Sequence, residues 1–321
     1  MSTEKLDLAR LRRDVVAAAN LADVQHDESR IQRVLEVFSE GFGSAAVELR
    51  TTTRPREERT LSYRYIELGH PHDPYRMAVD AGLLQPGGRP VDRLIGELQG
   101  KLAIQGYGVD AEASYGLEKI WPFFTVNYPM DHVLELEELP DAFRDNPRYF
   151  DRYGLTHFSI VAADYRHETA NLYFLVQKPG QYTPQTIASM IRDAGGEVPP
   201  PHVLDYIANM VAINVTCSWR SEEIERVCFY VPTVQPPFVP AWEHPLLARM
   251  VNETPIVAAH RAFIVGWAFG RTGSYTKLEI DYTGTTMEAF HRWTTIPEGP
   301  PSSRGGRQEL QGLPRPADLH G

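Results

Sequence analysis

The chain has 321 residues, of which 42 are acidic and 32 are basic, so its formal net charge is −10. This acidity argues against nucleic acid or an anionic membrane surface as the main partner. No run of roughly 18 or more apolar residues occurs, so no membrane span is predicted. The charged residues 1–14 lack the apolar core of a signal peptide, and we expect a cytoplasmic protein.

The chain contains two cysteines, Cys217 and Cys228. We expect both to be reduced and buried, as is usual inside cells. A disulfide across a hairpin is the alternative.

Predicted helices and strands alternate along the chain in a repeating order. Apolar residues at helical spacing predict helices over 6–22 and 31–42, and two extended segments then follow at 45–52 and 60–67. Helices followed by a two-stranded hairpin recur four more times. The later hairpins are 107–113 with 117–126, 156–163 with 169–176, 211–218 with 224–231, and 263–283. Their preceding helices are 73–84, 91–104, 134–153, 183–194, 202–208 and 245–251, and a last helix at 285–293 closes the series.

The hairpin turns fall near residues 56, 115, 167, 221 and 272, a spacing of roughly 50 to 60 residues that indicates one repeating architecture. Ten antiparallel strands can close into a barrel, which leaves no sheet edge. A barrel of this width leaves an internal cavity. We therefore predict an α+β fold, a ten-stranded antiparallel barrel with five helix-pair and hairpin repeats, helices outside and an active site in the lumen. This single domain spans 1–296, and a disordered tail rich in proline and glycine spans 297–321.

Strand alternation assigns charged and aromatic side chains to the inner face of this barrel. Ser62 and Arg64 share one face of their strand. The other inner residues are predicted to be Arg50, Leu117, Lys119, Trp121, Phe123, Asn171, Tyr173, Arg226, Cys228, Tyr230, Tyr275, Lys277 and Glu279. For each cation alone, a solvated strand residue is the alternative. Because the pattern recurs on five hairpins, we expect the lumen to hold a polyanion such as a diphosphate, which would offset the cost of burying several cations beside one carboxylate.

Five stretches resemble the soluble aromatic prenyltransferases of the ABBA, or PT-barrel, type. They are LSYRY (61–65), LEKIWPFF (117–124), DYRHETANLYF (164–174), IERVCFY (224–230) and VGWAFGRTGSYTKLEIDYTG (265–284). The resemblance covers about 8–293 and is strongest to the 4-hydroxyphenylpyruvate prenyltransferases of aminocoumarin biosynthesis. It implies a secondary-metabolism enzyme that moves an allylic group from its diphosphate to a small aromatic acceptor. Because Trp121, Tyr65 and Tyr230 are large, we expect dimethylallyl diphosphate to be preferred over geranyl diphosphate.

The resemblance also implies roles for individual residues. Those matching diphosphate-binding positions are Arg50, Arg64, Lys119, Asn171, Tyr173, Arg226, Lys277 and, nearby, Tyr275. Those expected around the prenyl group and acceptor are Trp121, Phe123, Ser159, Ala212, Asn214 and Tyr230. Glu279 matches the acidic residue of the acceptor pocket, where it would orient an O–H or N–H group and help accept a proton. A salt bridge to Lys277 or an arginine is the alternative role for Glu279.

Four positions depart from the pattern of the family. Ser62 replaces an aspartate of the magnesium-dependent relatives, Asn214 replaces a tyrosine, and His167 replaces a lysine. We therefore expect no metal and no cofactor, with Arg64 supplying charge in place of an ion. Ser159 replaces an arginine of the hydroxyphenylpyruvate enzymes, so we expect a hydroxylated or N–H aromatic acceptor other than 4-hydroxyphenylpyruvate.

Two rival functions make different predictions. A barrel that only carries a hydrophobic ligand needs no ring of cations deep in its lumen. A phosphatase or terpene cyclase usually needs clustered carboxylates for metal, which alternation does not place on the inner face. We therefore favour a prenyltransferase, and we expect it to be a monomer.

Overall fold

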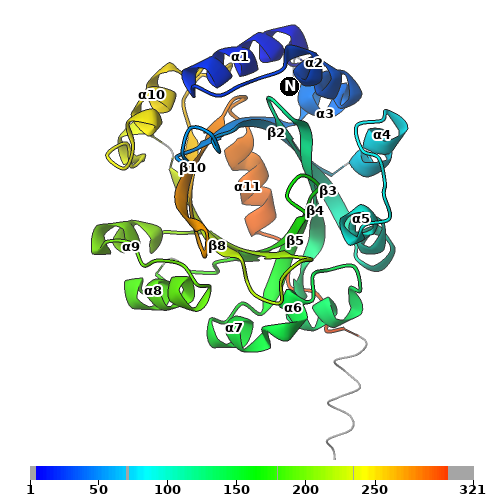
Figure 1. The fold of residues 1–321 in the computed structure, drawn as a ribbon, viewed down its shortest axis with the longest axis vertical. Helices are drawn as coiled ribbons and strands as arrows, with labels where there is room; N and C mark the ends of the chain where they lie inside the picture. Colours follow the sequence, from blue (N-terminus) through cyan, green and yellow to red (C-terminus); the bar gives the residue numbers. More distant parts are fainter. Residues whose placement is uncertain (1–4, 70–71, 179, 234, 303–321) are drawn as a thin grey trace, which may run out of the picture.

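The computed structural model describes residues 5–69, 72–178, 180–233 and 235–302. Ten strands within these ranges form one closed antiparallel barrel, and each strand neighbours the next along the chain (Figure 1). Pairing of β1 with β10 closes the ring, which confirms the predicted barrel. The strands are β1 (Ala46–Thr52), β2 (Leu61–Leu68), β3 (Ile104–Glu112), β4 (Gly116–Pro129), β5 (His157–Asp164), β6 (Thr169–Leu175), β7 (Ala212–Ser218), β8 (Arg226–Thr233), β9 (Phe263–Gly270) and β10 (Gly273–Asp281).

Helices α1 to α10 surround the barrel, and several begin with a proline in the first turn, where no backbone N–H is needed (Figure 1). Their bounds are α1 (Leu8–Leu21), α2 (Glu28–Val37), α3 (Ser39–Ser44), α4 (Pro74–Asp80), α5 (Pro90–Lys101), α6 (Ala142–Asp145), α7 (Pro147–Arg152), α8 (Pro184–Asp193), α9 (Pro201–Ile207) and α10 (Pro245–Glu253). Short 3₁₀ helices are η1 (Met130–Glu135) and η2 (Pro236–Phe238). No helix in these described ranges is long and apolar enough to cross a membrane.

The hydrophobic core lies between the outer face of the barrel and these helices. Tyr63 on β2 is fully buried there, with its ring centroid 5.7 Å from that of Phe42 on α3. A second and smaller apolar cluster, which includes Trp121 and Tyr230, lines the lumen. Because the outer faces bury most of the apolar side chains, the inner faces are free to carry charge.

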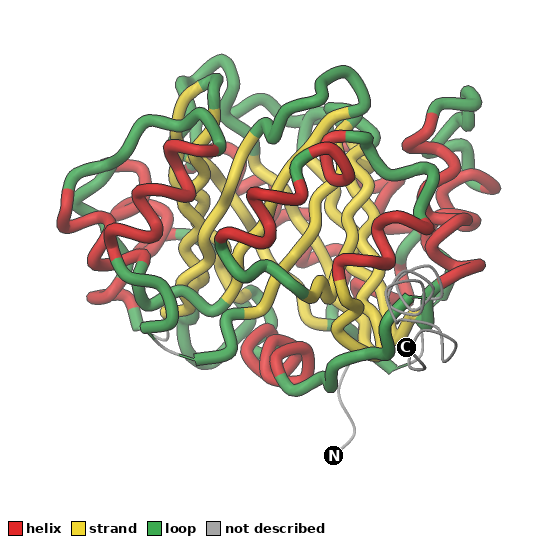
Figure 2. The backbone as a smooth tube through the Cα atoms, turned by 90° about the horizontal axis from the view of Figure 1, so that it is seen from below, coloured by secondary structure: helices red, strands yellow, loops and turns green. Residues whose placement is uncertain are grey.

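Helix α11 (Thr286–Thr294) lies across one end of the barrel, seen through the ring of strands in Figure 1 and below their ends in Figure 2. This position differs from the expected one outside the barrel. Trp293 belongs to the inner apolar cluster, and its Nε1 donates a hydrogen bond to Ser159 Oγ at 2.9 Å. The ring of Phe290 stacks edge-on against Trp293. The helix can bury these two aromatic side chains only by covering the open end of the lumen.

Two sequence-based expectations need correction. Leu117 packs in the outer core, because the register between β3 and β4 shifts between Asp110 and Ala111 and thereby brings Glu118 to the lumen. Cys217 and Cys228 are both free, as expected. Cys217 lies in the outer core and Cys228 in the inner cluster, so the wall of the barrel separates them.

The first residues of the expected tail are attached to β4. The N–H of Asn127 donates to Pro297 O at 2.7 Å, and that of Gly299 donates to Asn127 O at 2.8 Å. Ser302 N donates to Asp131 at 3.0 Å. Residues 297–302 are therefore held by hydrogen bonds and not disordered as expected, and 303–321 lie outside the described residues.

Candidate active site

The lumen contains two adjoining spaces, which share Tyr173 in their walls. We call the larger one the polar chamber. The smaller one is the apolar chamber, and α11 lies at one end of it. The predicted site residues that line the polar chamber are Arg50, Lys119, Asn171, Tyr173, Asn214, Arg226, Tyr275 and Lys277. Those that line the apolar chamber are Arg64, Trp121, Phe123, Tyr173, Ala212, Tyr230 and Glu279.

Three predicted residues are separated from the other members of their predicted groups. Arg64 lines the apolar chamber and Asn214 lines the polar one. Ser159 lines neither, because its hydroxyl binds Trp293 and donates to the backbone oxygen of Tyr173 at 3.3 Å. Ser159 thus joins β5 to α11 and β6 at this end of the barrel.

Arg226 and Lys277 are the cations that most need an anionic ligand. Arg226 donates to Thr216 Oγ1 at 3.3 Å, and Lys277 donates to the Tyr230 hydroxyl at 3.1 Å. Among the described residues, no carboxylate lies within ion-pair distance of either one. Burial lowers the pKa of Lys277, as expected for an ammonium that lacks a counter-charge.

Tyr275 lies between these two cations and Arg54, whose guanidinium carbon is 4.0 Å above the tyrosine ring centroid. Burial by itself would raise the pKa of Tyr275, but the charges of Arg226, Lys277 and Arg54 outweigh burial and lower it to about 7. The three cations therefore create a potential strong enough to favour a negative charge at this point of the polar chamber.

Carboxylates neutralise the remaining inner cations. Arg50 lies 3.2 Å from Asp110 and 3.4 Å from Glu118. Arg64 lies 3.0 Å from Asp110 and 3.2 Å from Glu279. The expectation of a single carboxylate beside the cations is therefore wrong. Glu48, Asp110, Glu118 and Asp164 are also buried in the lumen walls, in addition to Glu279.

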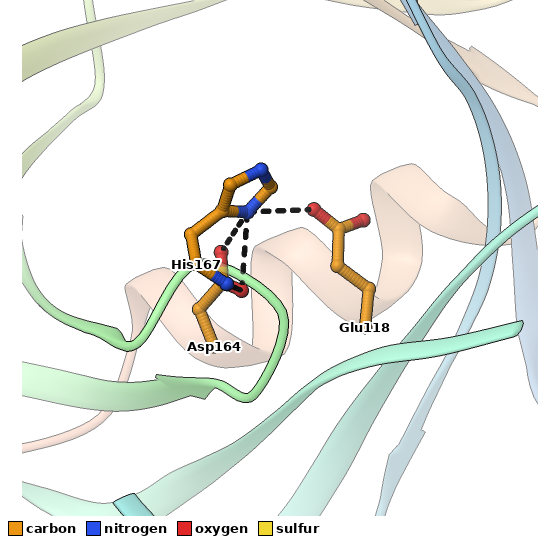
Figure 3. Close-up of side chains that lie close together, drawn as sticks. All are labelled: Glu118, Asp164 and His167. Carbon is orange, nitrogen blue, oxygen red and sulfur yellow. Dashed lines mark hydrogen bonds and ion pairs between the residues drawn. The ribbon is translucent and has the colours of Figure 1, made fainter. Parts of the chain in front are cut away.

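Glu118, Asp164 and His167 form a compact group at the wall of the polar chamber (Figure 3). One possible ligand atom from each lies within 4.8 Å of the others, so the expectation that clustered carboxylates are absent is also wrong. Lys119 Nζ lies 2.9 Å from Asp164 and 3.5 Å from Glu118. Burial opposes ionisation of Asp164, but the Lys119 ammonium and His167 together outweigh burial and lower the pKa of that carboxyl. Lys119 is thus an internal cation that pairs with both carboxylates of this group.

Stacked aromatic rings connect the two chambers. The ring centroids of Trp121 and Tyr173 are 6.4 Å apart, and those of Tyr173 and Tyr230 are 6.1 Å apart. Gly108 lies across from Trp121, where a Cβ atom would stand 2.1 Å from the indole. The absence of a side chain at residue 108 lets Trp121 lie against β3. Electron-rich ring faces in such an array can stabilise a carbocation.

Sequence comparison identifies the kind of protein that carries this site. The sequence model of the family "Aromatic prenyltransferase Orf2" matches residues 6–294. The chain belongs to the Orf2 family of aromatic prenyltransferases. It is 31% identical to a 4-hydroxyphenylpyruvate 3-dimethylallyltransferase of Streptomyces niveus, over 92% of this chain and 91% of the relative. It is 26% identical to a 5,10-dihydrophenazine-1-carboxylate 9-dimethylallyltransferase of Streptomyces anulatus, over 86% and 94%.

Solved structures share the fold of this aromatic prenyltransferase. The 5-dimethylallyl tryptophan synthase of Streptomyces coelicolor superimposes with a TM-score of 0.53 at 13% identity, over 92% of this chain and 97% of the other. At that identity the match concerns the barrel alone. The predicted family and fold are both confirmed.

Strand alternation could have found two of the missed carboxylates. Glu48 lies two residues before Arg50, and Asp110 lies opposite Arg64 in the register of β2 and β3. Glu118 could not be found in this way, because only the register shift brings it inward. The sequence did not indicate that Phe290 and Trp293 line the lumen, because helical spacing does not predict which helix covers an end of the barrel.

Proposed function

We propose that this enzyme transfers a dimethylallyl group from dimethylallyl diphosphate to a small hydroxylated or N–H aromatic compound, without a metal ion. The diphosphate would lie in the polar chamber against Arg226, Lys277 and Tyr275. The observation that carries this assignment is the pair of buried cations, Arg226 and Lys277, with no carboxylate partner in the described part of the chain. We keep a cytoplasmic monomer as part of the proposal.

The reaction would begin with cleavage of the C–O bond between the allyl group and the diphosphate. Arg226 and Lys277 are fixed where negative charge develops on the leaving group, and such preorganised charge lowers the barrier. The allyl cation would then rest against Trp121, Tyr173 and Tyr230. These three rings stabilise positive charge by cation–π attraction and exclude water from the cation.

The acceptor would lie in the apolar chamber beside Glu279. A ring carbon of the acceptor attacks the allyl cation and a C–C bond forms. The proton on that carbon is then lost. Glu279 would accept a hydrogen bond from the acceptor O–H or N–H, which raises electron density in the ring, and would help to remove a proton. Arg64, at 3.2 Å from Glu279, holds this carboxylate in place.

The test is incubation with dimethylallyl or geranyl diphosphate and a set of phenols, naphthols and nitrogen heteroaromatics, read by mass spectrometry. We expect transfer with the five-carbon donor, at a higher kcat/KM than with geranyl diphosphate, because aromatic side chains fill the space beside the allyl group. We also expect 4-hydroxyphenylpyruvate to be a poor acceptor. No transfer to any aromatic compound, or efficient turnover of 4-hydroxyphenylpyruvate, would contradict the corresponding part.

Replacement of Glu279 tests its role in the reaction. Glu279→Gln should slow transfer while leaving the affinity for dimethylallyl diphosphate close to that of the wild type, since the amide keeps the shape and loses the charge. A general base contributes roughly 10²- to 10⁴-fold to the rate. Glu253→Gln, on the exposed end of α10, is the matched control. A Glu279→Gln variant as fast as wild type would remove Glu279 from the mechanism.

A further inference from the structure

Glu48 is a buried carboxyl group in the apolar chamber that the proposed mechanism does not use. It lies on β1, where its cross-strand partners are Arg64 on β2 and Asp281 on β10. The side chain lines the apolar chamber, and its Oε2 has no hydrogen-bond partner among the described residues. Its nearest cation, Arg64 Nη1, is 3.6 Å away, too far for a good hydrogen bond. A buried polar atom left in this way is costly unless a ligand supplies a partner.

Arg64 cannot neutralise every carboxylate around it. Asp110 and Glu279 both approach its guanidinium more closely than Glu48 does. Burial, followed by repulsion from Glu279, raises the pKa of Glu48 to about 8, and the attraction of Arg64 does not cancel these effects. At neutral pH, Glu48 therefore carries a proton. A protonated carboxyl group has one O–H donor, whereas an ionised one only accepts hydrogen bonds.

The apolar chamber thus contains two neighbouring carboxyls with different hydrogen-bonding roles. Both contact the same nitrogen of Arg64, so they are close to one another. The surrounding walls are mostly aromatic or aliphatic, including Phe123, Ile160 and Phe290. A ligand that fills the chamber is therefore the natural partner for the O–H of Glu48.

We propose that Glu48 is a second acceptor-binding residue, which donates a hydrogen bond to a ring nitrogen or carbonyl oxygen of the aromatic acceptor while Glu279 accepts one from its O–H or N–H. This inference rests on the proposed function and narrows the substrate class. The preferred acceptor carries both kinds of group, as hydroxylated nitrogen heteroaromatics do. A simple naphthol would bind Glu279 and leave Glu48 without a partner.

A matched pair of ligands tests this inference by binding alone. 2-Naphthol and 7-hydroxyquinoline have the same shape, but only the second has a ring nitrogen; 6-hydroxyquinoline, with its nitrogen elsewhere, is included as well. By calorimetry at pH 6.5, the wild type should bind at least one hydroxyquinoline at least tenfold more tightly than 2-naphthol. Glu48→Ala should lose that preference and keep its affinity for 2-naphthol within about threefold. Glu48→Gln, which retains N–H donors, should restore most of the preference.

The pattern of losses decides whether Glu48 acts as a donor. Equal weakening of both kinds of ligand in Glu48→Ala, a wild type without preference, or a Glu48→Gln variant as impaired as Glu48→Ala would overturn the inference. Glu253→Gln is the surface control, and circular dichroism checks that each variant is folded. Turnover with dimethylallyl diphosphate, measured separately, tests the proposed function, so each hypothesis can fail without the other.

The pH dependence of the ligand preference provides a second test of the donor role of Glu48. The charged groups that face Glu48 are Arg64 on β2, Asp110 on β3, and Glu279 and Asp281 on β10. As pH rises through about 8, Glu48 loses its proton, and its O–H donor is lost. The wild-type preference for the hydroxyquinoline should decline over that range, whereas the preference of Glu48→Gln should stay level. A wild-type preference that does not change between pH 6.5 and 9 would contradict the donor role.

Discussion

Two residues in the lumen, Arg226 and Lys277, differ from the other inner cations by what lies around them. Arg50, Arg64 and Lys119 each contact at least one carboxylate. Breaking such buried pairs leaves an unpaired charge, so their loss would combine effects on stability and catalysis. Arg226 and Lys277 have no such partner in the described ranges. Their removal should therefore affect mainly the binding and turnover of the anionic substrate, and the stability of the fold much less.

Alanine substitutions of these two residues test this assignment. Arg226→Ala and Lys277→Ala should each reduce kcat by about 10²-fold or more, since one preorganised donor at a developing charge contributes roughly 2.7–4 kcal/mol. Both variants should melt close to the wild-type temperature, because no internal carboxylate loses its partner. Arg148→Ala, on the exposed surface of α7, is the control. Near-normal turnover in both variants would mean that the diphosphate binds elsewhere.

Tyr275 should couple binding of the diphosphate to uptake of a proton. Its pKa is lowered to about 7 by the surrounding cations, so at pH 7.5 much of the free enzyme carries a tyrosinate. A bound diphosphate adds negative charge nearby, raises the pKa of Tyr275 and favours the protonated phenol, which can donate a hydrogen bond to the ligand. Calorimetry in buffers of different ionisation enthalpy should therefore show proton uptake in the wild type, relative to Tyr275→Phe. Identical proton balances would rule out this coupling.

Helix α11 determines the depth of the apolar chamber. It contributes Thr286, Ala289, Phe290 and Trp293 to the chamber walls. The hydrogen bond from Trp293 Nε1 to Ser159 fixes the helix to β5. This hydrogen bond links a wall of the apolar chamber to a strand residue that lines neither chamber.

A double-mutant cycle measures this contact. Ser159→Ala leaves the buried indole N–H without a partner, which costs about 1–3 kcal/mol. We expect a lower melting temperature and a several-fold higher KM for the aromatic acceptor, with the KM for dimethylallyl diphosphate unchanged. Trp293→Phe removes the indole N–H itself. In that background, Ser159→Ala should therefore lower the free energy of unfolding much less than it does in the wild type. Additive effects would show that the two side chains act independently.

Across the barrel as a whole, most of the charged side chains on the inner surface are paired with an opposite charge from the same chain. Lys119 lies between Glu118 and Asp164, and Arg50 lies between Asp110 and Glu118. Ser62 accepts a hydrogen bond from Arg50 at 3.1 Å. An internal ammonium or guanidinium group thus lies beside each of these carboxylates.

This arrangement predicts that prenyl transfer persists in excess EDTA. The group of Glu118, Asp164 and His167 is the place where a metal would bind if one were needed. His167→Ala should therefore change neither the activity nor its resistance to chelation, because Lys119 and Arg50 already pair with the two carboxylates. Loss of activity in EDTA that magnesium restores would contradict the prediction. If His167→Ala also abolished activity, the metal would be assigned to this group.

The period of helices and hairpins, read from local sequence, was enough to predict the closed barrel, because strands that follow one another in the chain are usually neighbours in the sheet. Alternation along β2, β8 and β10 was likewise enough to place Arg64, Arg226 and Lys277 on the inner face, since side chains alternate strictly in a regular strand. Long matching motifs identified the family. Each of these inferences depends on residues that are near one another in the sequence.

Only the tertiary structure decided which charges meet inside the barrel. The register shift in β4 turns Glu118 inward and Leu117 outward, and no local sequence pattern predicts this shift. The position of α11 across the barrel end depends on where its aromatic side chains can be buried. The pKa of Glu48 is raised first by burial and then shaped by four charged groups from three other strands. Electrostatic interactions and packing act through space, so residues distant in the sequence decide which cations remain free for a substrate.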